Sequence, residues 1–541
     1  MVPAIAITAA SLGIAFVPSA ASATPRTETA QVSGESSQFD ITSTKVAGID
    51  VDKSTILQLE AQMNRGRLSS VELVRFYERR IAALNPKLHA VITVSKSAAA
   101  EAAAADRARR HGDRRPLLGI PVLVKDNIDT TGMPTTAGSL ALAGSSPSDA
   151  FIVMKLKAAG ALILGKTNLS EWANYRSTQS SSGWSGVEGQ TNMAYVLDRN
   201  PCGSSAGSGV AASADLATVA VGTETDGSVV CPSGQNGLVG IKPTLGLASR
   251  SGIVPISSQQ DTSGPMARNV TDAAVLLGAL TGVDSSDPAT AAQRGHVTTD
   301  YTKYLKAGAL KGVRLGVWRQ GNFGSSPETD AIMEQTIKKL KSLGAVIVDP
   351  ANVQIDAAYA PENTALEYEF KHDIAAYLQK YTAPKYPKTL QGLINFDNAH
   401  ASQELKYFGQ EIFTESQARG PLTDPAYIKA RNSARSIAQH SIDDTLAKYK
   451  LAAIIAPTNG PAWTTDLING DHFLVGSSSP AAIAGYPSIT VPAGYSFHLP
   501  VGMSFIGGKW DEPELISLSY AWEQATHVRQ APQFLPTVPM R

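Results

Sequence analysis

The chain has 541 residues, of which 43% are hydrophobic and 17% are charged, a composition typical of a soluble globular protein with a large core. Lys and Arg together number 47, as do Asp and Glu, so the formal net charge is zero. No net electrostatic field therefore attracts the chain to nucleic acid or to an anionic membrane surface, and we expect neither as a partner.

The first 48 residues are predicted to lie outside the folded domain. Residues 4–17 form a run of fourteen mostly apolar residues, shorter than the roughly 20 residues that span a bilayer. The small-x-small sequence Ala21-Ser22-Ala23 follows, which predicts a signal peptide at 1–23 and a flexible mature N-terminus at 24–48. The usual basic residues at the start are missing, so a buried N-terminal helix and a start codon placed too late stay open as alternatives. We expect an exported protein, periplasmic or secreted, without a stable membrane span.

Helices and apolar strands alternate along the rest of the chain. In chain order the sequence predicts helices at 54–85 and 97–115, a strand within 117–129, a helix and a strand within 149–171, strands at 215–224 and 237–244, long charged helices from about 285 to 460, and further strands from 451 to 507. This alternation predicts one large α/β domain at 49–535, with a central mixed, twisted β-sheet covered by helices on both faces. The helical region at about 285–460 is expected to shape the substrate pocket.

Two short motifs match known patterns but lack the structural context that those patterns need. Residues 160–167 (GALILGKT) match the phosphate-binding pattern GxxxxGK[ST], but their apolar centre predicts a buried strand preceded by a helix, so we expect no nucleotide. Residues 203–207 (GSSAG) match the nucleophile elbow GxSxG of α/β-hydrolases, which requires an apolar strand directly before the serine. A turn precedes it here, which makes Ser205 the rival nucleophile rather than the favoured one.

A serine hydrolase built on this chain would lack a nearby histidine. The nine histidines lie at 89, 111, 296, 372, 400, 440, 472, 498 and 527, outside the Gly- and Ser-rich residues 176–265. Lysine is the next candidate base, but it must be neutral, and its ordinary pKa of about 10.4 falls only on burial. The apolar residues 121–124 would carry Lys125 into a dry interior, and strand alternation directs Asp126 to the other face. The alternative is a surface lysine at the end of a strand.

Three segments together resemble the amidase signature family: VLVKDN around Lys125, NPCGSSAGSGVA around Ser204 and GTETDGSVVCP around Ser228. Other blocks similar to the family follow in family order from about residue 50 to 530 and are weakest in the helical region. The resemblance implies a single amidase-signature domain that hydrolyses carboxamides through an acyl-serine intermediate. It assigns Ser228 as the nucleophile, Ser204 as a bridging serine after a cis peptide bond, and Lys125 as the base.

The resemblance also implies how the substrate carbonyl is bound. The expected oxyanion hole consists of the backbone N–H groups of Thr225, Asp226, Gly227 and Ser228. No metal and no cofactor are expected. The alternatives are a fatty-acid or aryl amide hydrolase of the same family, the amidotransferase subunit that makes glutaminyl-tRNA in a cytosolic complex, and an inactive binding protein with the same fold.

Within the family, the blocks at 175–205, 222–232 and 366–378 most resemble the bacterial peptide amidases. This resemblance implies that the enzyme removes ammonia from the C-terminal carboxamide of peptides and spares internal peptide bonds. The expected partner is therefore a small-molecule or peptide amide, and we expect a monomer. A groove must hold the peptide, and the side chains proposed to line it are aromatics from 360–410 together with Trp172, Tyr175, Arg176 and Trp184, which could instead pack in the core.

The two cysteines, Cys202 and Cys231, lie two and three residues from the two serines of the resemblance. A fold that joins the serines would bring the cysteines near each other. A disulfide needs Cα atoms within about 7 Å, which the sequence does not guarantee. Two separate buried thiols are the favoured interpretation, and the disulfide is left open.

Overall fold

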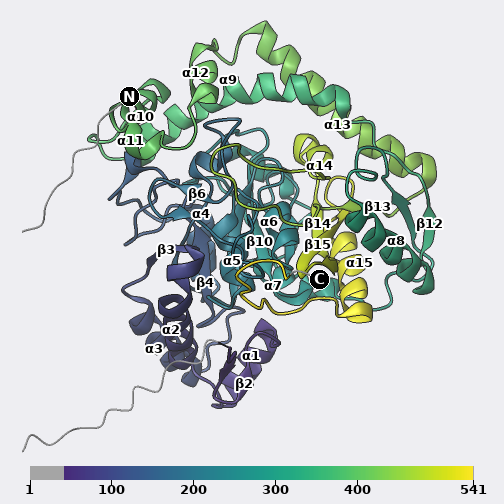
Figure 1. Ribbon diagram of the computed structural model, residues 1–541. Helices are drawn as coiled ribbons and strands as arrows, with labels where there is room; N and C mark the ends of the chain where they lie inside the picture. Colours follow the sequence, from purple (N-terminus) through teal and green to yellow (C-terminus); the bar gives the residue numbers. More distant parts are fainter. Residues whose placement is uncertain (1–41, 540–541) are drawn as a thin grey trace, which may run out of the picture. The chain divides into compact units, whose positions relative to one another are not determined.

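In the computed structural model, which describes residues 42–539, eleven strands form one mixed sheet (Figure 1). In spatial order they are β12 (Val346–Val348), β11 (Arg314–Val317), β13 (Ala453–Pro457), β15 (Leu499–Ile506), β14 (Ser488–Ser496), β9 (Val239–Lys242), β10 (Thr262–Ala267), β8 (Val219–Glu224), β4 (Pro121–Lys125), β5 (Leu162–Thr167) and β3 (Val91–Val94). The predicted mixed α/β sheet is confirmed.

The strands that carry the candidate site lie inside the sheet, away from its edges. β4 runs parallel to both neighbours, with Leu123 opposite Ala220 of β8 and Val122 opposite Ile163 of β5. β8 pairs antiparallel with β10 on its other side. Every residue of these four strands is buried, which explains their continuous small and apolar sequences.

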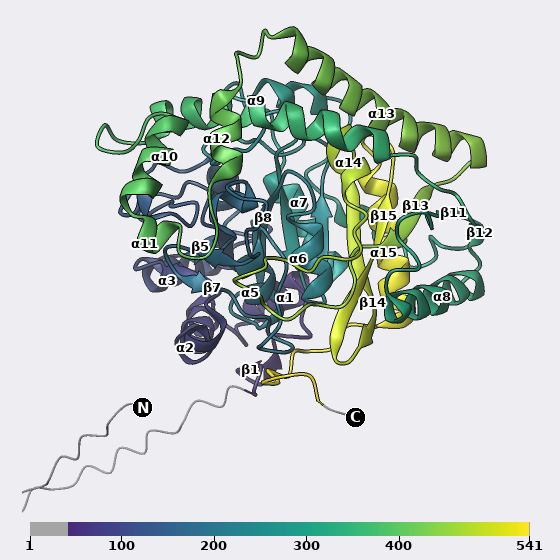
Figure 2. The same cartoon turned by 45° about the horizontal axis from the view of Figure 1, so that its top comes forward.

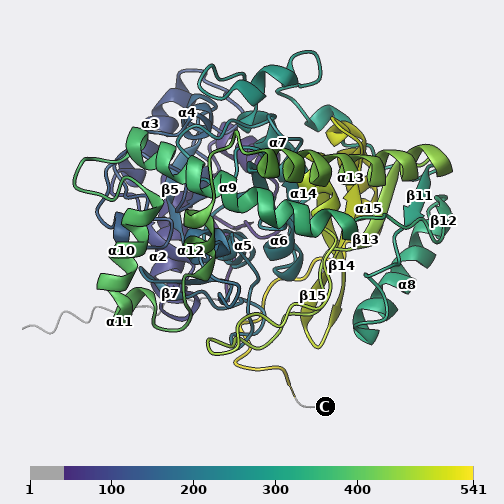
Figure 3. The same ribbon diagram turned by 90° about the horizontal axis from the view of Figure 1, so that it is seen from above.

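Helices cover both faces of the sheet (Figure 3). One face carries α5 (Ala206–Ser213) and α6 (Val230–Gln235), and the other carries α4 (Phe151–Ala158), α7 (Val270–Leu280) and α15 (Glu512–Thr526), while α8 (Pro327–Ser342) packs on β12, β13, β14 and β15. α1 (Ile56–Asn64) contacts α7, while α2 (Ser70–Leu88) and α3 (Ala98–Arg110) pack together beside β3, β4 and β5. The stretch 54–85, predicted to be helical with a cap at Ser69-Ser70, forms two helices, because Gly66 has a positive φ of 68° and Ser69 caps α2.

The helical region forms a separate layer above one end of the sheet, as Figures 1 and 2 show. It contains α9 (Asp356–Tyr381), α10 (Leu390–Ala399), α11 (Ala401–Glu404), α12 (Glu411–Ala418) and α13 (Pro425–Tyr449), and α14 (Ser479–Ala484) contacts α13. Arg431 of α13 donates to both carboxylate oxygens of Glu369 of α9, at 2.7 and 2.5 Å. Ser257, before β10, donates to the same carboxylate at 2.5 Å, which joins this layer to the sheet.

The prediction of 285–460 as helical was incomplete. β11 and β12 lie within this stretch and pair in parallel at the edge of the sheet, on either side of α8 in the sequence. These strands have only four and three residues. Such short strands show too little alternation for the sequence pattern to reveal them.

The predicted signal peptide at 1–23 lies outside the described residues, as does most of the predicted tail at 24–48. The last residues of that tail are described, and β1 (Lys45–Val46) pairs antiparallel with β2 (Ile49–Asp50). Arg80 Nη1 donates to the carbonyl of Ser43 at 3.2 Å and joins this hairpin to α2. Regular structure therefore begins before residue 49. Among the described residues, no helix is both long and apolar enough to cross a membrane.

Candidate active site

Lys125 is the last residue of β4, and its side chain is completely buried. Its Nζ donates to Ser204 Oγ at 2.7 Å. It also donates to both oxygens of Thr223, at 2.9 Å to Oγ1 and 3.3 Å to the backbone carbonyl. The amino group therefore lies between the segment before α5 and the end of β8. These two segments follow Lys125 in the sequence by about 80 and about 100 residues, respectively.

Burial lowers the pKa of Lys125 from 10.5 to about 7. Removal from water is the largest cause, because the charged ammonium loses its hydration. The carboxyl groups of Asp261 and Glu224 act in the opposite direction and raise the pKa. A substantial fraction of this lysine is therefore neutral near pH 7, whereas an exposed lysine is almost fully charged.

The adjacent Asp126 turns away from Lys125, as strand alternation predicts. Its Oδ1 lies 3.0 Å from Nζ of Lys166, and both side chains are buried. Its Oδ2 accepts from the backbone N–H of Thr136 at 3.1 Å and from the hydroxyl of the same residue. Lys166 belongs to the GALILGKT stretch, whose last six residues are the buried strand β5 rather than a phosphate-binding loop.

The segment before α5 places Ser204 next to Lys125. The peptide bond between Gly203 and Ser204 is cis, as the family resemblance implies. A Cβ atom on Gly203 would lie only 2.2 Å from Ser170 Oγ, so no larger residue fits there. The carbonyl of Ser204 accepts from the N–H of Ser170 at 3.0 Å. The chain after β5 thus packs closely against this serine and fixes its position.

Ser205 does not have the geometry of a nucleophile elbow. No strand leads into it, and it is completely buried as the residue before α5. Its hydroxyl donates to the carbonyl of Thr223 at 3.1 Å and accepts from the N–H of the same residue at 3.2 Å. The Ser205 hydroxyl therefore joins α5 to β8, which leaves it unsuited to attack a substrate.

Ser228 lies between β8 and α6 and is 7% exposed. Gly227 before it has a φ of +79°, a left-handed conformation that favours glycine. Within the described part of the chain, no protein group accepts a hydrogen bond from the backbone N–H groups of residues 225–228. The N–H groups of Val229 and Val230, by contrast, both donate to Glu224 Oε2, at 2.7 and 3.0 Å. Four consecutive unbonded donors next to a serine suit a developing oxyanion.

Cys202 and Cys231 form a disulfide, with a Cα–Cα distance of 6.1 Å, which corrects the favoured interpretation of two separate thiols. The physical reason is the pairing of the two serine segments: the N–H of Ser205 donates to the carbonyl of Ser228 at 3.2 Å, and this holds the two cysteines nearby. The disulfide is buried under Trp463.

Comparisons with known proteins show the family of the chain. The family model described as Amidase matches residues 72–516. The chain belongs to the amidase family. A probable amidase of Arabidopsis thaliana is 38% identical over 516 residues, covering 93% of this chain and 95% of the relative. The structure of native peptide amidase from Stenotrophomonas maltophilia is 48% identical, with a TM-score of 0.86, and the alignment covers 89% of this chain and 99% of the other.

The same comparisons include a glutamyl-tRNA(Gln) amidotransferase subunit of Acinetobacter baumannii, 32% identical over 504 residues, with coverage of 89% of this chain and 98% of the relative. The family match and the peptide amidase structure together show that this amidase is an amide hydrolase, structurally close to peptide amidase. The amidase-signature fold predicted from the resemblance is confirmed.

The aromatic groove proposed from the sequence is wrong for most of its residues. Trp172 and Trp184 are 2% and 5% exposed and pack in the core of the amidase. Arg176 is completely buried, pairs with Glu171 at 2.7 Å and stacks over the ring of Phe408 at 4.4 Å. Tyr175 is half-buried against the same core, which also contains aromatics of α9 and α12. These large side chains fill the space between the sheet and the helical layer, where burial of their area stabilises the fold.

Several residues at the site had no individual signal in the sequence. Thr223 contacts Lys125 directly, and Asn127 Nδ2 donates to Thr223 Oγ1 at 2.9 Å. Asp261 accepts from the hydroxyl of Thr225 at 2.6 Å, and Ser478 Oγ donates to Asp226 Oδ1 at 2.5 Å. Thr223, Asn127 and Asp261 lie within blocks that resemble the family, but Ser478 lies outside them and is brought to the site only by folding.

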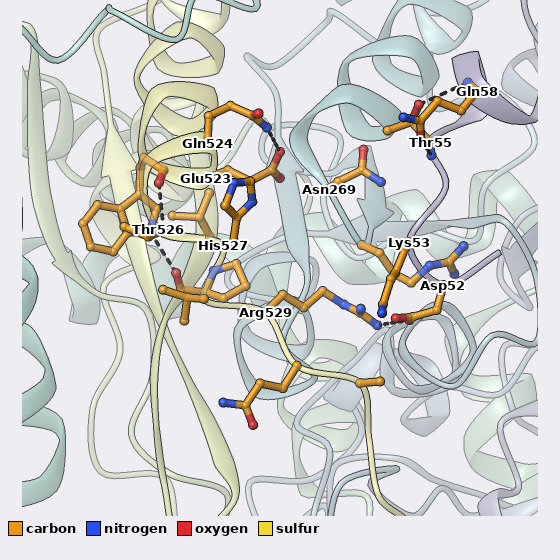
Figure 4. Close-up of a pocket in the computed structure, with 17 residues that line it drawn as sticks. Asp52, Lys53, Thr55, Gln58, Asn269, Glu523, Gln524, Thr526, His527 and Arg529 are labelled. Atoms are coloured by element: carbon orange, nitrogen blue, oxygen red, sulfur yellow. Dashed lines mark hydrogen bonds and ion pairs between the residues drawn. The ribbon is translucent and has the colours of Figure 1, made fainter. Parts of the chain in front are cut away.

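A cavity of about 600 Å³ lies outside the candidate site (Figure 4). It is lined by residues of the N-terminal segment and of the chain around and after α15. Arg529 and Asp52 form an ion pair of 2.8 Å at its wall. Lys125, Ser204 and Ser228 do not line this cavity, so its size does not identify the active site.

We expect replacement of both cysteines by serine to lower the free energy of unfolding. The disulfide closes a loop between positions 29 residues apart, and such a loop corresponds to about 3–4 kcal/mol of lost chain entropy in the unfolded state. Urea unfolding of the oxidised wild type and of Cys202→Ser/Cys231→Ser measures the difference. A reducing agent should destabilise the wild type alone, and two alkylatable thiols in unreduced native protein would contradict the assignment.

Proposed function

We propose that this amidase hydrolyses primary amides with Ser228 as nucleophile, Ser204 as proton relay and Lys125 as base. The observation that carries the proposal is the contact of 2.7 Å between Ser204 Oγ and a completely buried Lys125 Nζ. The family resemblance assigns Ser228 as the nucleophile. Two observations support this role: the unbonded N–H groups lie at and just before Ser228, and the carbonyl of Ser228 accepts a hydrogen bond from Ser205 N–H.

The contacts of Lys125 suit a neutral amine. A neutral amino group has two hydrogens and one lone pair. Thr223 offers two acceptors within reach, its hydroxyl and its carbonyl, and these take up the two hydrogens. When Lys125 is neutral, its lone pair is then directed at the third neighbour, Ser204, whose hydroxyl donates to Nζ instead of accepting from it. Thr223 therefore orients the base so that it accepts the proton that passes through Ser204.

The proposed reaction proceeds through two acyl transfers. Ser228 Oγ attacks the carbonyl carbon of the amide, and its proton passes through Ser204 to Lys125. The N–H groups of residues 225–228 stabilise the oxyanion, and Lys125 returns the proton through Ser204 to the leaving nitrogen, which departs as ammonia. Water then attacks the acyl-serine by the same proton route, which releases the free acid and restores Ser228.

We propose the C-terminal carboxamide of peptides as the substrate. The 48% identity to peptide amidase over 99% of that chain supports this choice above the 32% identity to the amidotransferase subunit. A fatty-acid or aryl amide substrate, and an inactive binding protein, are the alternatives that the test below separates. We also propose export; the Cys202–Cys231 disulfide supports it, since disulfides persist mainly in oxidising compartments.

The proposed roles predict a definite order of mutant effects. Ser228→Ala and Lys125→Met should each lower kcat by at least about a thousandfold, because each removes a group that the bond-making step needs. Ser204→Ala should leave a small residual rate, and Ser205→Ala should mainly lower stability. Steady-state kinetics and labelling with a fluorophosphonate probe measure this. Labelling at Ser205 instead of Ser228, or loss of acylation on replacement of a histidine, would refute the lysine mechanism.

The base also predicts a pH profile. Only neutral Lys125 accepts a proton, so kcat/KM should rise as pH increases through about 7 and then reach a plateau. The midpoint belongs to the lysine together with its two serines. The measurement is kcat/KM from pH 5 to 9 on an uncharged amide. A maximum near pH 5 with loss of activity above pH 7 is incompatible with this base.

The substrate is tested with three amides. The protein is incubated with a dipeptide amide, a matching tripeptide with a free carboxyl terminus, and a long-chain fatty amide, while ammonia and new termini are measured. Ammonia from the dipeptide amide with an intact tripeptide is the expected result. A preference of about tenfold or more for the fatty amide, equivalent to about 1.4 kcal/mol in transition-state binding, contradicts the proposal.

A further inference from the structure

Residues 461–478, here called the strap, connect β13 to α14 and run alongside both serine segments. Trp463 of the strap packs on the Cys202–Cys231 disulfide. Asp471 Oδ1 accepts from the backbone N–H of Ser182 at 3.0 Å. Ser478, at the end of the strap, donates to Asp226 at 2.5 Å. Figure 2 shows the yellow-green chain between β13 and α14 passing in front of α5 and α6.

Two of these contacts bracket the candidate active site. Ser182 lies against Gly203, since a Cβ atom on that glycine would be 3.1 Å from Ser182 Oγ. Asp226 is two residues before Ser228. The stretch 472–477 therefore connects a residue that contacts the neighbour of Gly203 to a residue that contacts the loop before Ser228.

This stretch exposes an apolar surface. Phe473 is 48% exposed and Leu474 is 66% exposed. Three of the ten large exposed hydrophobic side chains among the described residues belong to the strap, the third being Ile468. Such concentration of apolar side chains on a short surface segment indicates a contact with another molecule.

The ring of Phe473 is held in place by other residues of the strap. The ring of Phe473 packs edge-on to Trp463 at 5.9 Å, with an interplanar angle of 84°. A Cβ atom on Gly476 would lie 2.5 Å from the Phe473 ring, so the ring rests directly on this glycine. Because Trp463 in turn covers the disulfide, Phe473 is connected by packing to both serine segments.

The helical layer places a polar pair near the same loop. Gln260 Nε2 donates to Glu362 Oε1 of α9 at 2.8 Å and to the carbonyl of Thr225 at 3.5 Å. A carboxyl group of the helical layer therefore lies near the loop that precedes Ser228. An apolar substrate group is stabilised more by the exposed apolar side chains of the strap than by this polar pair.

We propose that Phe473 and Leu474 bind the apolar side chain of the residue that carries the scissile carboxamide, and so set the preference of the enzyme for apolar C-terminal residues. The inference rests on the proposed hydrolysis of peptide amides. Ammonia is small, so the leaving side makes few contacts. Binding energy for the substrate comes from the acyl side, where this side chain lies.

The test compares two substrates that differ only in that side chain, benzyloxycarbonyl-Gly-Phe-amide and benzyloxycarbonyl-Gly-Gly-amide. The blocked amino end removes any contribution from charge. In wild type, kcat/KM should favour the Phe amide. In Phe473→Ala/Leu474→Ala this preference should fall by about tenfold, the scale on which an apolar pocket discriminates, while turnover of the Gly amide stays within about twofold.

Ile468→Ala is the matched control. Ile468 is 76% exposed on the same strap but precedes Asp471, so it lies outside the stretch 472–477. The control should retain the wild-type preference, and urea unfolding should show that both variants fold normally. An equal fall for both substrates, an unchanged preference, or a change only in binding to phosphatidylcholine vesicles overturns the inference. Wild type that hydrolyses neither amide overturns the proposed function itself, and this inference with it.

Discussion

The candidate active site depends on keeping one amino group out of water. Lys125 ends a strand that lies inside the sheet, between β8 and β5, and this position removes its Nζ from solvent. Burial alone accounts for the fall of its pKa, and the two nearby carboxyls of Asp261 and Glu224 limit that fall to about 7. A larger fall of the pKa would make the lysine a weak base, and a smaller fall would leave it charged and unable to accept a proton. The position of β4 in the sheet thus sets the chemistry.

Both serine segments are fixed to the end of β8. Ser205 joins α5 to Thr223, and Glu224 binds the first N–H groups after Ser228. Thr223 in addition contacts Lys125. One strand end therefore positions Lys125 and the segments of Ser204 and Ser228 relative to one another. The disulfide adds a covalent connection between the same two segments on the side that Trp463 covers.

The parts that we propose to select the substrate come from elsewhere in the chain. Glu362 of the helical layer lies near the loop before Ser228 through Gln260, and Phe473 of the strap packs on Trp463. Neither belongs to the sheet, and neither contacts Lys125. In the proposed mechanism this division separates the groups that activate the serine from those that select a substrate, so we expect that substrate preference can change without disturbing the pKa of Lys125.

The sequence alone determined the family, the mixed α/β sheet, the GALILGKT strand and the orientation of Asp126 away from Lys125, because each depends on local pattern or on spacing within one segment. It also pointed to Lys125, Ser204 and Ser228 through three blocks of similar residues. Tertiary structure decided what depends on distant segments meeting: the disulfide, the Thr223 contacts, and the burial of Trp172, Arg176 and Trp184. The sequence does not distinguish an aromatic side chain in a groove from one in a core, because it does not show which surface covers that side chain. Only the folded chain, which brings the helical layer onto the sheet and the strap onto the serines, distinguishes the two.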